Sequence, residues 1–422
     1  MLNKLCLIKN NKTLLNGALF SIFSFINKGF GFLLLLILAN YIAPAEYGYL
    51  NLYNTVVMVV GYFIAMSSEG YLCVSYFREG EVGIKNTFSC ILGTTVITTL
   101  LFCAILFVGG YVLADALNLP LASLYLAVSI SFLTVYTHVN LDLFRLREKV
   151  GIYGVFSCGN ALLNFILSIL LVKTLLMGWE GRVYAQMICY TVFGVIGLLY
   201  FLKENYISLP NKEHWKKMLL WSIPLIPHLA TNFIRQGCDR YIINYYHTIE
   251  DVGLFSFALN LANIIVMVGM GFNQSNSVDI YKVLGDKSMD VELKKNHLGK
   301  QRKMVGIVYI LLSVLIVALF MILTPFLVPK YSSCTRYLPL LGVYGLLNCG
   351  YFLYSNYLFF FGKTKMIMYT TFISSIVHLV MSLLFTQYSL MFTCLIYCIT
   401  QGVILYMIVY LAKKELNQQL SY

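Results

Sequence analysis

The sequence predicts an all-α, polytopic membrane protein with about twelve transmembrane helices, arranged as two six-helix halves around a central cavity. Of the 422 residues, 59% are hydrophobic and only 11% are charged, whereas soluble domains carry about 25% charged residues. Long apolar runs follow one another along the chain, each close to the roughly 20 residues that a helix needs to cross a bilayer. Basic residues gather in alternate loops between these runs, as in multispan proteins with a fixed orientation.

The apolar runs define the expected spans, with boundaries soft by a few residues. They cover residues 14–42, 49–69, 86–113, 119–142, 150–172, 180–202, 218–245, 252–276, 304–328, 337–361, 366–386 and 388–412. The first run follows Lys4, Lys9 and Lys12, as in a signal peptide. It is too long for one, and no small-residue cleavage site closes it. We therefore expect a retained first helix.

The loop charges predict the orientation. One side of the predicted spans carries Arg78, Lys85, Arg145, Arg147, Lys149, Lys203, Lys212, Lys216, Lys217, Lys282, Lys287, Lys294, Lys295, Lys300, Arg302, Lys303, Lys363, Lys365, Lys413 and Lys414. The other side carries only Lys173, Arg182, Lys330 and Arg336 near span ends. The positive-inside rule places the first side, with both termini, in the cytoplasm. The net charge of +12 therefore reflects short loops, and nucleic acid is not an expected partner.

A weak internal repeat supports the two halves, residues 1–210 and 211–422. Residues 45–53, AEYGYLNLY, and residues 250–258, EDVGLFSFA, each open the second span of a half with an acidic residue, a spacer and glycine. Two halves of the same orientation imply an axis along the membrane normal, an architecture used by transporters.

Lys28 lies near the centre of the first predicted span. A charge at that depth costs at least ~2.5 kcal/mol, so it usually faces a cavity or a partner. A lysine that extends to the membrane surface is the alternative. We favour the cavity, because about 20 Å of helix lies on either side of Lys28.

The seventh predicted span is the most polar. His228, Asn232, Arg235 and Asp239 recur at helical spacing on one face, and Arg240 flanks them. Arg235 and Asp239 are one turn apart and can pair, so a purely structural ion pair is an alternative interpretation. Two arginines against one aspartate nevertheless leave an excess of positive charge.

Further polar residues lie in neighbouring spans. Asn260, Asn263 and Gln274 recur along the eighth span, where any single amide is more simply explained as a hydrogen bond between helices. Pro224 and Pro227 precede the polar face of the seventh span and predict a bend in it. The polar stretch from Lys282 to Lys303 is expected to be a solvated connector rather than an interfacial helix.

The sequence contains no motif for catalysis, for a metal or for a cofactor, and no long outward loop that would hold an active site. Eleven cysteines are present, and only Cys334 falls in an outward loop, where we expect it to be exposed. We interpret the others as small apolar packing residues.

Several segments in order resemble the Wzx O-antigen flippases, in the polysaccharide branch of the multidrug/oligosaccharidyl-lipid/polysaccharide exporter superfamily. They are SIPLIPH at 222–228, DRYII at 239–243, EDVGLFSF at 250–257 and YIAPAEYGYL at 41–50. FNQSNSVDIY at 272–281 is similar to the end of that family's eighth span, without its usual proline. The resemblance covers essentially the whole chain.

The resemblance implies transfer of an undecaprenyl-pyrophosphate-linked oligosaccharide from the cytoplasmic to the periplasmic leaflet of a bacterial inner membrane. Its partners would be that substrate, membrane lipids, and a polymerase with a chain-length regulator. We then expect Lys28, Arg235 and Arg240 to attract the pyrophosphate and Asp239 to orient the arginines.

The amides Asn232, Asn260, Asn263 and Gln274 are expected to bind the glycan. Glu69, Asp142, Asp239 and His228 are candidates for coupling to a proton or sodium gradient. The sequence does not decide whether such coupling exists.

Three alternatives remain. A cation-coupled drug exporter of the same superfamily should expose carboxylates rather than excess Lys and Arg within the membrane. A membrane polysaccharide polymerase or ligase would need a sizeable outward loop. A lipid II flippase usually has about two more spans.

Overall fold

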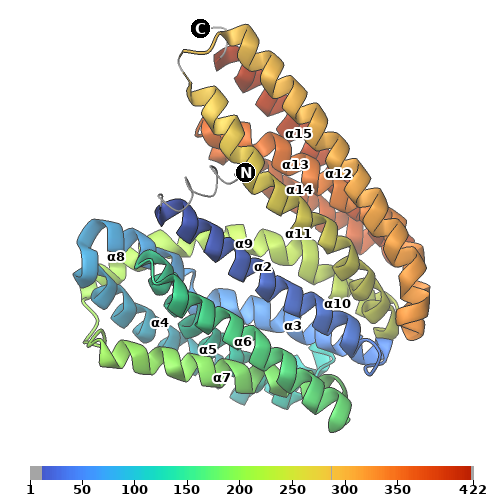
Figure 1. Ribbon diagram of the computed structural model, residues 1–422. Helices are drawn as coiled ribbons and strands as arrows, with labels where there is room; N and C mark the ends of the chain where they lie inside the picture. The colour runs from blue at the N-terminus through green and yellow to red at the C-terminus, as the bar shows by residue number, and fades with distance from the viewer. Residues whose placement is uncertain (1–11, 287, 420–422) are drawn as a thin grey trace. The chain divides into compact units, whose positions relative to one another are not determined.

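A computed structural model describes residues 12–286 and 288–419, and all regular secondary structure in these two ranges is helical (Figure 1). The α-helices are α2 (Lys12–Leu38), α3 (Pro44–Ala65), α4 (Tyr71–Leu117), α5 (Leu121–Leu146), α6 (Val150–Ile169), α7 (Gly178–Lys203), α8 (Lys212–Ser222), α9 (Ile226–Asn232), α10 (Cys238–Tyr246), α11 (Ile249–Gly285), α12 (Val291–Leu327), α13 (Leu338–Phe360), α14 (Thr364–Phe385) and α15 (Leu390–Gln419). Short 3₁₀ or π segments connect some of them: η1 (Ser68–Gly70), η2 (Leu170–Thr174), η3 (Ile223–Leu225), η4 (Phe233–Gly237) and η5 (Pro329–Tyr337).

The helices confirm the all-α, polytopic class. Within the described ranges, nine helical stretches are long and apolar enough to cross a membrane. The other three predicted spans coincide with α2, with the broken series α8 to α10, and with α13. Each expected span therefore has a helical counterpart.

The chain divides into two compact units, Met1–Ala230 (unit 1) and Thr231–Tyr422 (unit 2). This boundary lies inside the seventh predicted span and not between residues 210 and 211, because α8 packs on α4 and so belongs to unit 1. The division into two halves of six spans each stays a prediction.

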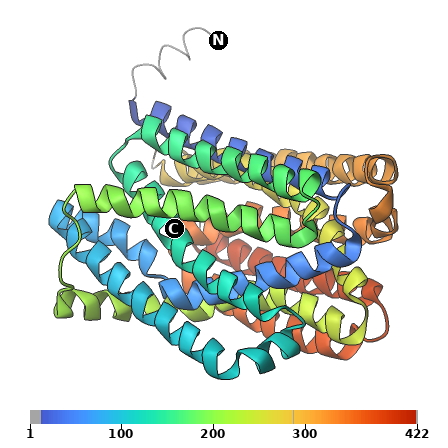
Figure 2. The same cartoon turned by 90° about the horizontal axis from the view of Figure 1, so that it is seen from below.

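Helix α5 is the central helix of unit 1. It packs against α3, α4, α6 and α7, while α2 lies along α6 (Figures 1 and 2). Its core face carries the buried residues Tyr136, Val139 and Leu143. The Tyr136 hydroxyl lies 2.6 Å from Thr95 Oγ1 of α4, so the ring is buried without losing its polar partner.

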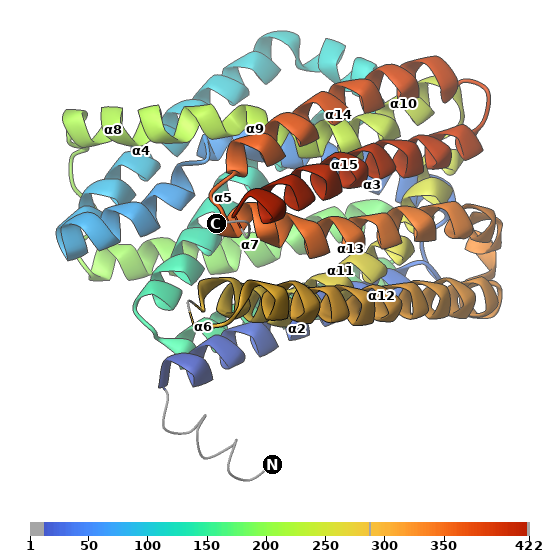
Figure 3. The same ribbon diagram turned by 90° about the horizontal axis from the view of Figure 1, so that it is seen from above.

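Helix α13 has the same place in unit 2, where it packs against α11, α12, α14 and α15 (Figure 3). Buried apolar residues of α11, α12, α13, α14 and α15 form one cluster, which includes Leu298, Tyr357 and Leu416. Since lipid surrounds the outer faces, close packing rather than water exclusion is what distinguishes this interior from the membrane.

The repeat found in the sequence is a helix cap in both units. At the start of α3, Glu46 Oε2 accepts a hydrogen bond from the Ala43 amide at 2.9 Å. At the start of α11, Thr248 Oγ1 accepts from the Asp251 amide at 3.2 Å, and Asp251 Oδ2 accepts from the Thr248 amide at 3.3 Å. The acidic residue of each copy therefore satisfies a free backbone donor at the helix end.

The seventh predicted span is broken, as Pro224 and Pro227 predicted. Helix α8 ends at Ser222 in the 3₁₀ turn η3, and α9 leads into the π segment η4 before α10 begins. Proline lacks an amide donor and interrupts the helical ladder, and a π segment shifts the register of every side chain beyond it.

The polar stretch from Lys282 to Lys303 contains no separate interfacial helix within the described residues: α11 runs to Gly285 and α12 begins at Val291, where Asp290 caps the Glu292 amide at 3.0 Å. The expectation for Cys334 was wrong. Cys334 is not exposed but fully buried in η5. Burial raises the pKa of its thiol to about 12, so Cys334 is an unreactive packing residue.

Gly178 is a position where glycine is required, and it supplies a stability prediction. Its φ is +56°, and a Cβ there would overlap Oε1 of Glu46, the cap of α3. We expect Gly178→Ala to lower the free energy of unfolding by about 2–3 kcal/mol through backbone strain and loss of the cap.

Thermal unfolding in detergent measures this effect. Gly109→Ala in α4 is the matched control, since a Cβ there meets nothing within 4 Å. Equal melting temperatures for the two variants would contradict the prediction.

Candidate functional site

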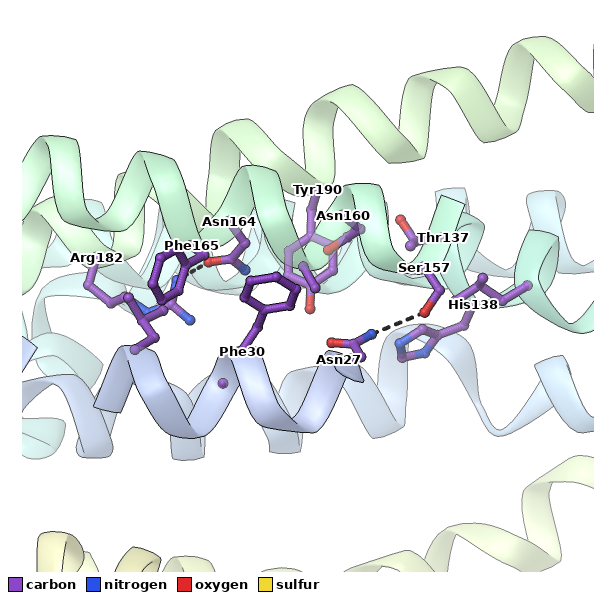
Figure 4. A pocket seen from close by; sticks show the side chains of 14 residues that line it. Asn27, Phe30, Thr137, His138, Ser157, Asn160, Asn164, Phe165, Arg182 and Tyr190 are labelled. Atoms are coloured by element: carbon purple, nitrogen blue, oxygen red, sulfur yellow. Dashed lines mark hydrogen bonds between the residues drawn. The ribbon is translucent and has the colours of Figure 1, made fainter. Parts of the chain in front are cut away.

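A polar cavity of about 220 Å³ lies within unit 1, between α2, α5, α6 and α7 (Figure 4). Amides and hydroxyls make up much of its wall. The lining residues are Asn27, Phe30, Gly31, Leu34, Thr137, His138, Leu141, Ser157, Asn160, Ala161, Asn164, Phe165, Arg182 and Tyr190. Asn160 and Asn164 are one turn apart on α6, so this helix turns its amides to one side.

Arg182, in the first turn of α7, is the cation of this cavity. Its Nη1 donates to Asn164 Oδ1 (Figure 4). The same atom donates to Ser168 Oγ at 2.8 Å. Both partners are neutral, so the guanidinium is held in place and keeps its charge. The sequence placed Arg182 among the outer-side charges and assigned it no role.

Asn27 reaches the cavity, whereas its neighbour Lys28 is not among the lining residues. Asn27 Nδ2 donates to Ser157 Oγ at 3.2 Å (Figure 4). Lys28 follows about 100° further round α2 and is exposed on the surface of unit 1. Its attraction of substrate anions stays a prediction.

Two of the predicted coupling carboxylates lie near this cavity. Glu69 Oε1, in η1, lies 4.0 Å from Nδ1 of His138, which lines the cavity. Asp142 Oδ1 lies 2.7 Å from Nη2 of Arg145, one turn away on α5. Asp142 thus has a local arginine partner, and His138 is the residue that links Glu69 to the cavity.

Unit 2 contains a second polar cluster, built on α10, η4, α14 and α15. Asp239 Oδ2 lies 2.8 Å from Nε2 of His378, and both side chains are almost fully buried. His378 Nδ1 lies 3.1 Å from Thr400 Oγ1, and the Tyr397 ring packs edge-on against the imidazole. Within the described residues, Asp239 Oδ1 has no hydrogen-bond partner.

Arg235 does not form the pair with Asp239 that a spacing of one turn would allow. Arg235 Nη2 donates instead to Oε1 of Gln401 at 2.7 Å. The physical reason is the π segment η4, which contains Arg235 and ends just before α10. Its wider turn removes the i, i+4 alignment on which the prediction rested.

The other predicted residues are distributed along α9, α10 and α11. Arg240 is half-buried on α10, Asn260 and Asn263 are half-buried on α11, and Gln274 is exposed near the end of α11. The side chains of His228 and Asn232 lie outside the described part of the structure. The assigned roles of all these residues stay predictions.

Charge is distributed unevenly between these clusters. Arg182 and Arg235 donate to neutral side chains, whereas Asp239 has a histidine partner and Asp142 an arginine. Arg147, just beyond the end of α5, differs from Arg182 and Arg235 because it has acidic partners. Its Nη2 lies 2.5 Å from Glu81 Oε2, and its Nη1 lies 3.5 Å from Glu204 Oε2. Arg182 and Arg235 are therefore hydrogen-bonded to neutral side chains, whereas Asp239 and Asp142 each contact a basic side chain.

Comparison with known proteins agrees with the fold. A family described as polysaccharide biosynthesis protein matches residues 14–278, which is more than half of the chain. The chain belongs to this family. A second family, MatE, matches residues 224–384.

Two proteins of Haemophilus influenzae are similar to this member of the polysaccharide biosynthesis protein family. One, named "Lsg locus putative protein 1", is 20% identical over 84% of this chain and 87% of its own length. The other, named "Uncharacterized membrane protein", is 24% identical over 88% of this chain and 89% of its own length.

Solved structures of similar fold are transporters. An inward-facing multidrug resistance MATE family transporter of the MOP superfamily superposes with a TM-score of 0.73 at 14% identity, over 91% of this chain and 94% of its own. An outward-facing conformation gives 0.62 at 14% identity, over 95% of both chains. The chain thus has the fold of MOP superfamily transporters.

Proposed function

We propose that this chain is a flippase. Its substrate is an undecaprenyl-pyrophosphate-linked oligosaccharide, the repeat unit of an O-antigen or a related surface polysaccharide. It moves this lipid from the cytoplasmic to the periplasmic leaflet of a bacterial inner membrane by alternating access, with both termini in the cytoplasm, and it performs no catalysis.

One observation carries the proposal: two arginines inside the predicted spans, Arg182 and Arg235, donate hydrogen bonds to neutral side chains. Asn164 and Ser168 position Arg182 without neutralising its charge, and Gln401 does the same for Arg235. A guanidinium in this state is suited to a pyrophosphate, which it meets with charge-assisted hydrogen bonds. The substrate's polyprenyl tail stays in the lipid.

The neutral polar wall around Arg182 supports the glycan part of the proposal. Sugar hydroxyls lose several kcal/mol each when they enter hydrocarbon without a partner. The amides and hydroxyls of α2, α5 and α6 replace those lost hydrogen bonds. In unit 2 we assign the same role to Arg240, Asn232, Asn260, Asn263 and Gln274. Lys28, in unit 1, would add a further cation.

Asp239 is the strongest candidate for coupling to a proton or cation gradient. It is buried, it contacts His378, and one of its oxygens is free to accept within the described residues. Glu69, Asp142 and His228 remain further candidates. A polysaccharide polymerase and a chain-length regulator are the proposed protein partners, because they act on the unit once it has crossed.

Arg235→Ala tests the proposal directly. We expect surface polysaccharide to fall about 10-fold or more, since hydrogen bonds to charged groups contribute about 1.5–3 kcal/mol. Surface glycan is quantified in a strain that lacks the native gene, with protein levels checked in the membrane. Arg235→Lys should restore part of the export, because it keeps the charge. Normal glycan on the Arg235→Ala strain would remove Arg235 from the mechanism.

Deletion of the gene distinguishes flipping from polymerisation. We expect lipid-linked repeat units to accumulate on the cytoplasmic side of the membrane. Single units capped on the cell surface would instead indicate a polymerase.

A cation-coupled multidrug exporter is the second candidate, favoured by the MatE match and by the fold. A site for organic cations needs an unneutralised carboxylate, whereas Asp239 and Asp142 each have a basic partner. If the chain were such an exporter, its deletion would sensitise cells to ethidium and leave surface glycan unchanged.

A further inference from the structure

A second pocket, of about 290 Å³, lies where the start of α12 meets the end of α15 in unit 2. We call it the basic pocket. It is lined by Lys295, Leu298 and Arg302 from α12 and by Lys413, Leu416 and Asn417 from α15. Lys295 and Arg302 are seven residues apart, which places them two turns apart on the same face. Three cations therefore converge, and the lining contains no acidic residue.

The nearest acid on α15 does not neutralise these cations. Glu415 Oε1 lies 3.2 Å from Nζ of Lys363, and the Glu415 side chain is only 5% exposed. Lys363, which does not line the pocket, therefore already balances the charge of Glu415. The Arg302 guanidinium lies 5.9 Å and 5.8 Å from the ring centroids of Tyr354 and Tyr357, contacts that orient it and keep its charge.

The floor of the pocket is apolar. Leu298 and Leu416 both belong to the buried cluster of unit 2. A site with cationic walls over an apolar floor fits a ligand that has both a phosphate and a hydrocarbon part. It fits a free inorganic anion less well, because desolvating the leucines contributes nothing to such binding.

The pocket also lies at the depth of the lipid headgroups. In α12 the apolar part begins at Met304, directly after Arg302 and Lys303, and in α15 it ends at Ala412, directly before Lys413. Basic residues at the ends of spans mark the cytoplasmic surface, and basic pockets between helices there bind anionic headgroups.

We propose that the basic pocket binds the phosphate of an anionic lipid in the cytoplasmic leaflet. The inference rests on the orientation given in the proposed function, but it concerns a site separate from the residues assigned to transport. The phosphate belongs either to a bulk anionic phospholipid or to the lipid-linked diphosphate before it is moved.

Native mass spectrometry of the purified full-length protein tests this site. The protein is titrated with phosphatidylglycerol, with phosphatidylcholine, with undecaprenyl diphosphate or with inorganic phosphate. We expect phosphatidylglycerol or undecaprenyl diphosphate to be retained at least about 10-fold more strongly than phosphatidylcholine. Tighter retention of one of the two anionic lipids identifies the source of the phosphate. Binding of inorganic phosphate as strong as that of either lipid would overturn the lipid assignment.

A charge-matched pair of variants separates the pocket from general surface charge. The pocket variant is Lys295→Gln/Arg302→Gln/Lys413→Gln, and the control is Lys300→Gln/Lys303→Gln/Lys414→Gln. The three control lysines are exposed neighbours on the same helices and do not line the pocket. We expect a loss of about 10-fold or more in anionic lipid retention for the pocket variant and less than about 2-fold for the control. Equal losses would overturn the proposal.

If the triple variant does not fold, Arg302→Gln against Lys303→Gln repeats the comparison with one charge. Failure of the lipid-binding proposal is distinguishable from failure of the proposed transport function. Lipid retention is measured without transport, and Arg235→Ala should retain phosphatidylglycerol normally.

Discussion

Replacing His378 by leucine is expected to lower the free energy of unfolding by about 3 kcal/mol, because it leaves a buried carboxylate without its partner. Asp239 Oδ2 lies 2.8 Å from His378 Nε2, and neither side chain is more than 1% exposed. The other carboxylate oxygen has no hydrogen-bond partner within the described residues, so it offers no compensation. Thermal unfolding of the purified protein in detergent measures the loss.

Asp239→Asn is the matched change on the other side of the pair. An amide keeps nearly the same volume and can still hydrogen-bond to His378, so we expect its cost in stability to be about 1 kcal/mol. The double variant Asp239→Asn/His378→Leu should be more stable than His378→Leu alone. An unpaired buried amide costs less than an unpaired buried carboxylate.

Transport separates a structural role of this pair from a coupling role. If Asp239 takes up a proton or cation during the cycle, Asp239→Asn abolishes export while the protein stays folded. Full export by the stable Asp239→Asn variant would show that the pair only supports the fold. Recovery of stability without recovery of export in the double variant is the expected pattern.

The sequence predicted the fold well because the membrane imposes strong rules. A span must be long, apolar and helical, since lipid offers no partner for a free backbone group. These rules located all twelve segments, and Pro224 and Pro227 located the break in the seventh. Likewise, Glu46 and Asp251 were visible as equivalent positions because both cap a helix.

The polar partners were harder to predict, because they depend on contacts between distant segments. His378 and Gln401 lie far along the chain from Asp239 and Arg235, and nothing local connects them. The π segment η4 also changes the register between Arg235 and Asp239, and a 3.6-residue periodicity cannot anticipate such a change.

Arg182 was missed for a different reason. It lies close to a predicted span end, where a basic residue is ordinary, so its place in a cavity was not apparent. A signal was nevertheless present in the partner helix. Ser157, Asn160, Asn164 and Ser168 recur three or four residues apart in the otherwise apolar fifth span, which marks a polar face.

Arg182→Met is expected to reduce the export of surface glycan about 10-fold to 100-fold. Methionine keeps an unbranched stem and removes the charge, so the change isolates the electrostatic contribution that a charged hydrogen bond makes. Surface glycan in a strain lacking the native gene is the measurement, normalised to protein in the membrane. Lys173→Met is the control, since Lys173 is a cation of the same predicted side, exposed over the Tyr41 ring.

Stability should change little in Arg182→Met, which makes a loss of export informative. Without the guanidinium, Ser168 Oγ still donates to the Asn164 carbonyl at 2.6 Å and lies 3.3 Å from Asn164 Oδ1. Ser168 Oγ therefore keeps a partner, while Asn164 Oδ1 loses its main donor but faces the polar cavity, where water can replace it. Arg182→Lys should recover part of the export, because a cation remains in the cavity. If Arg182→Met exports as well as Lys173→Met, the positive charge of this cavity does not act on the substrate.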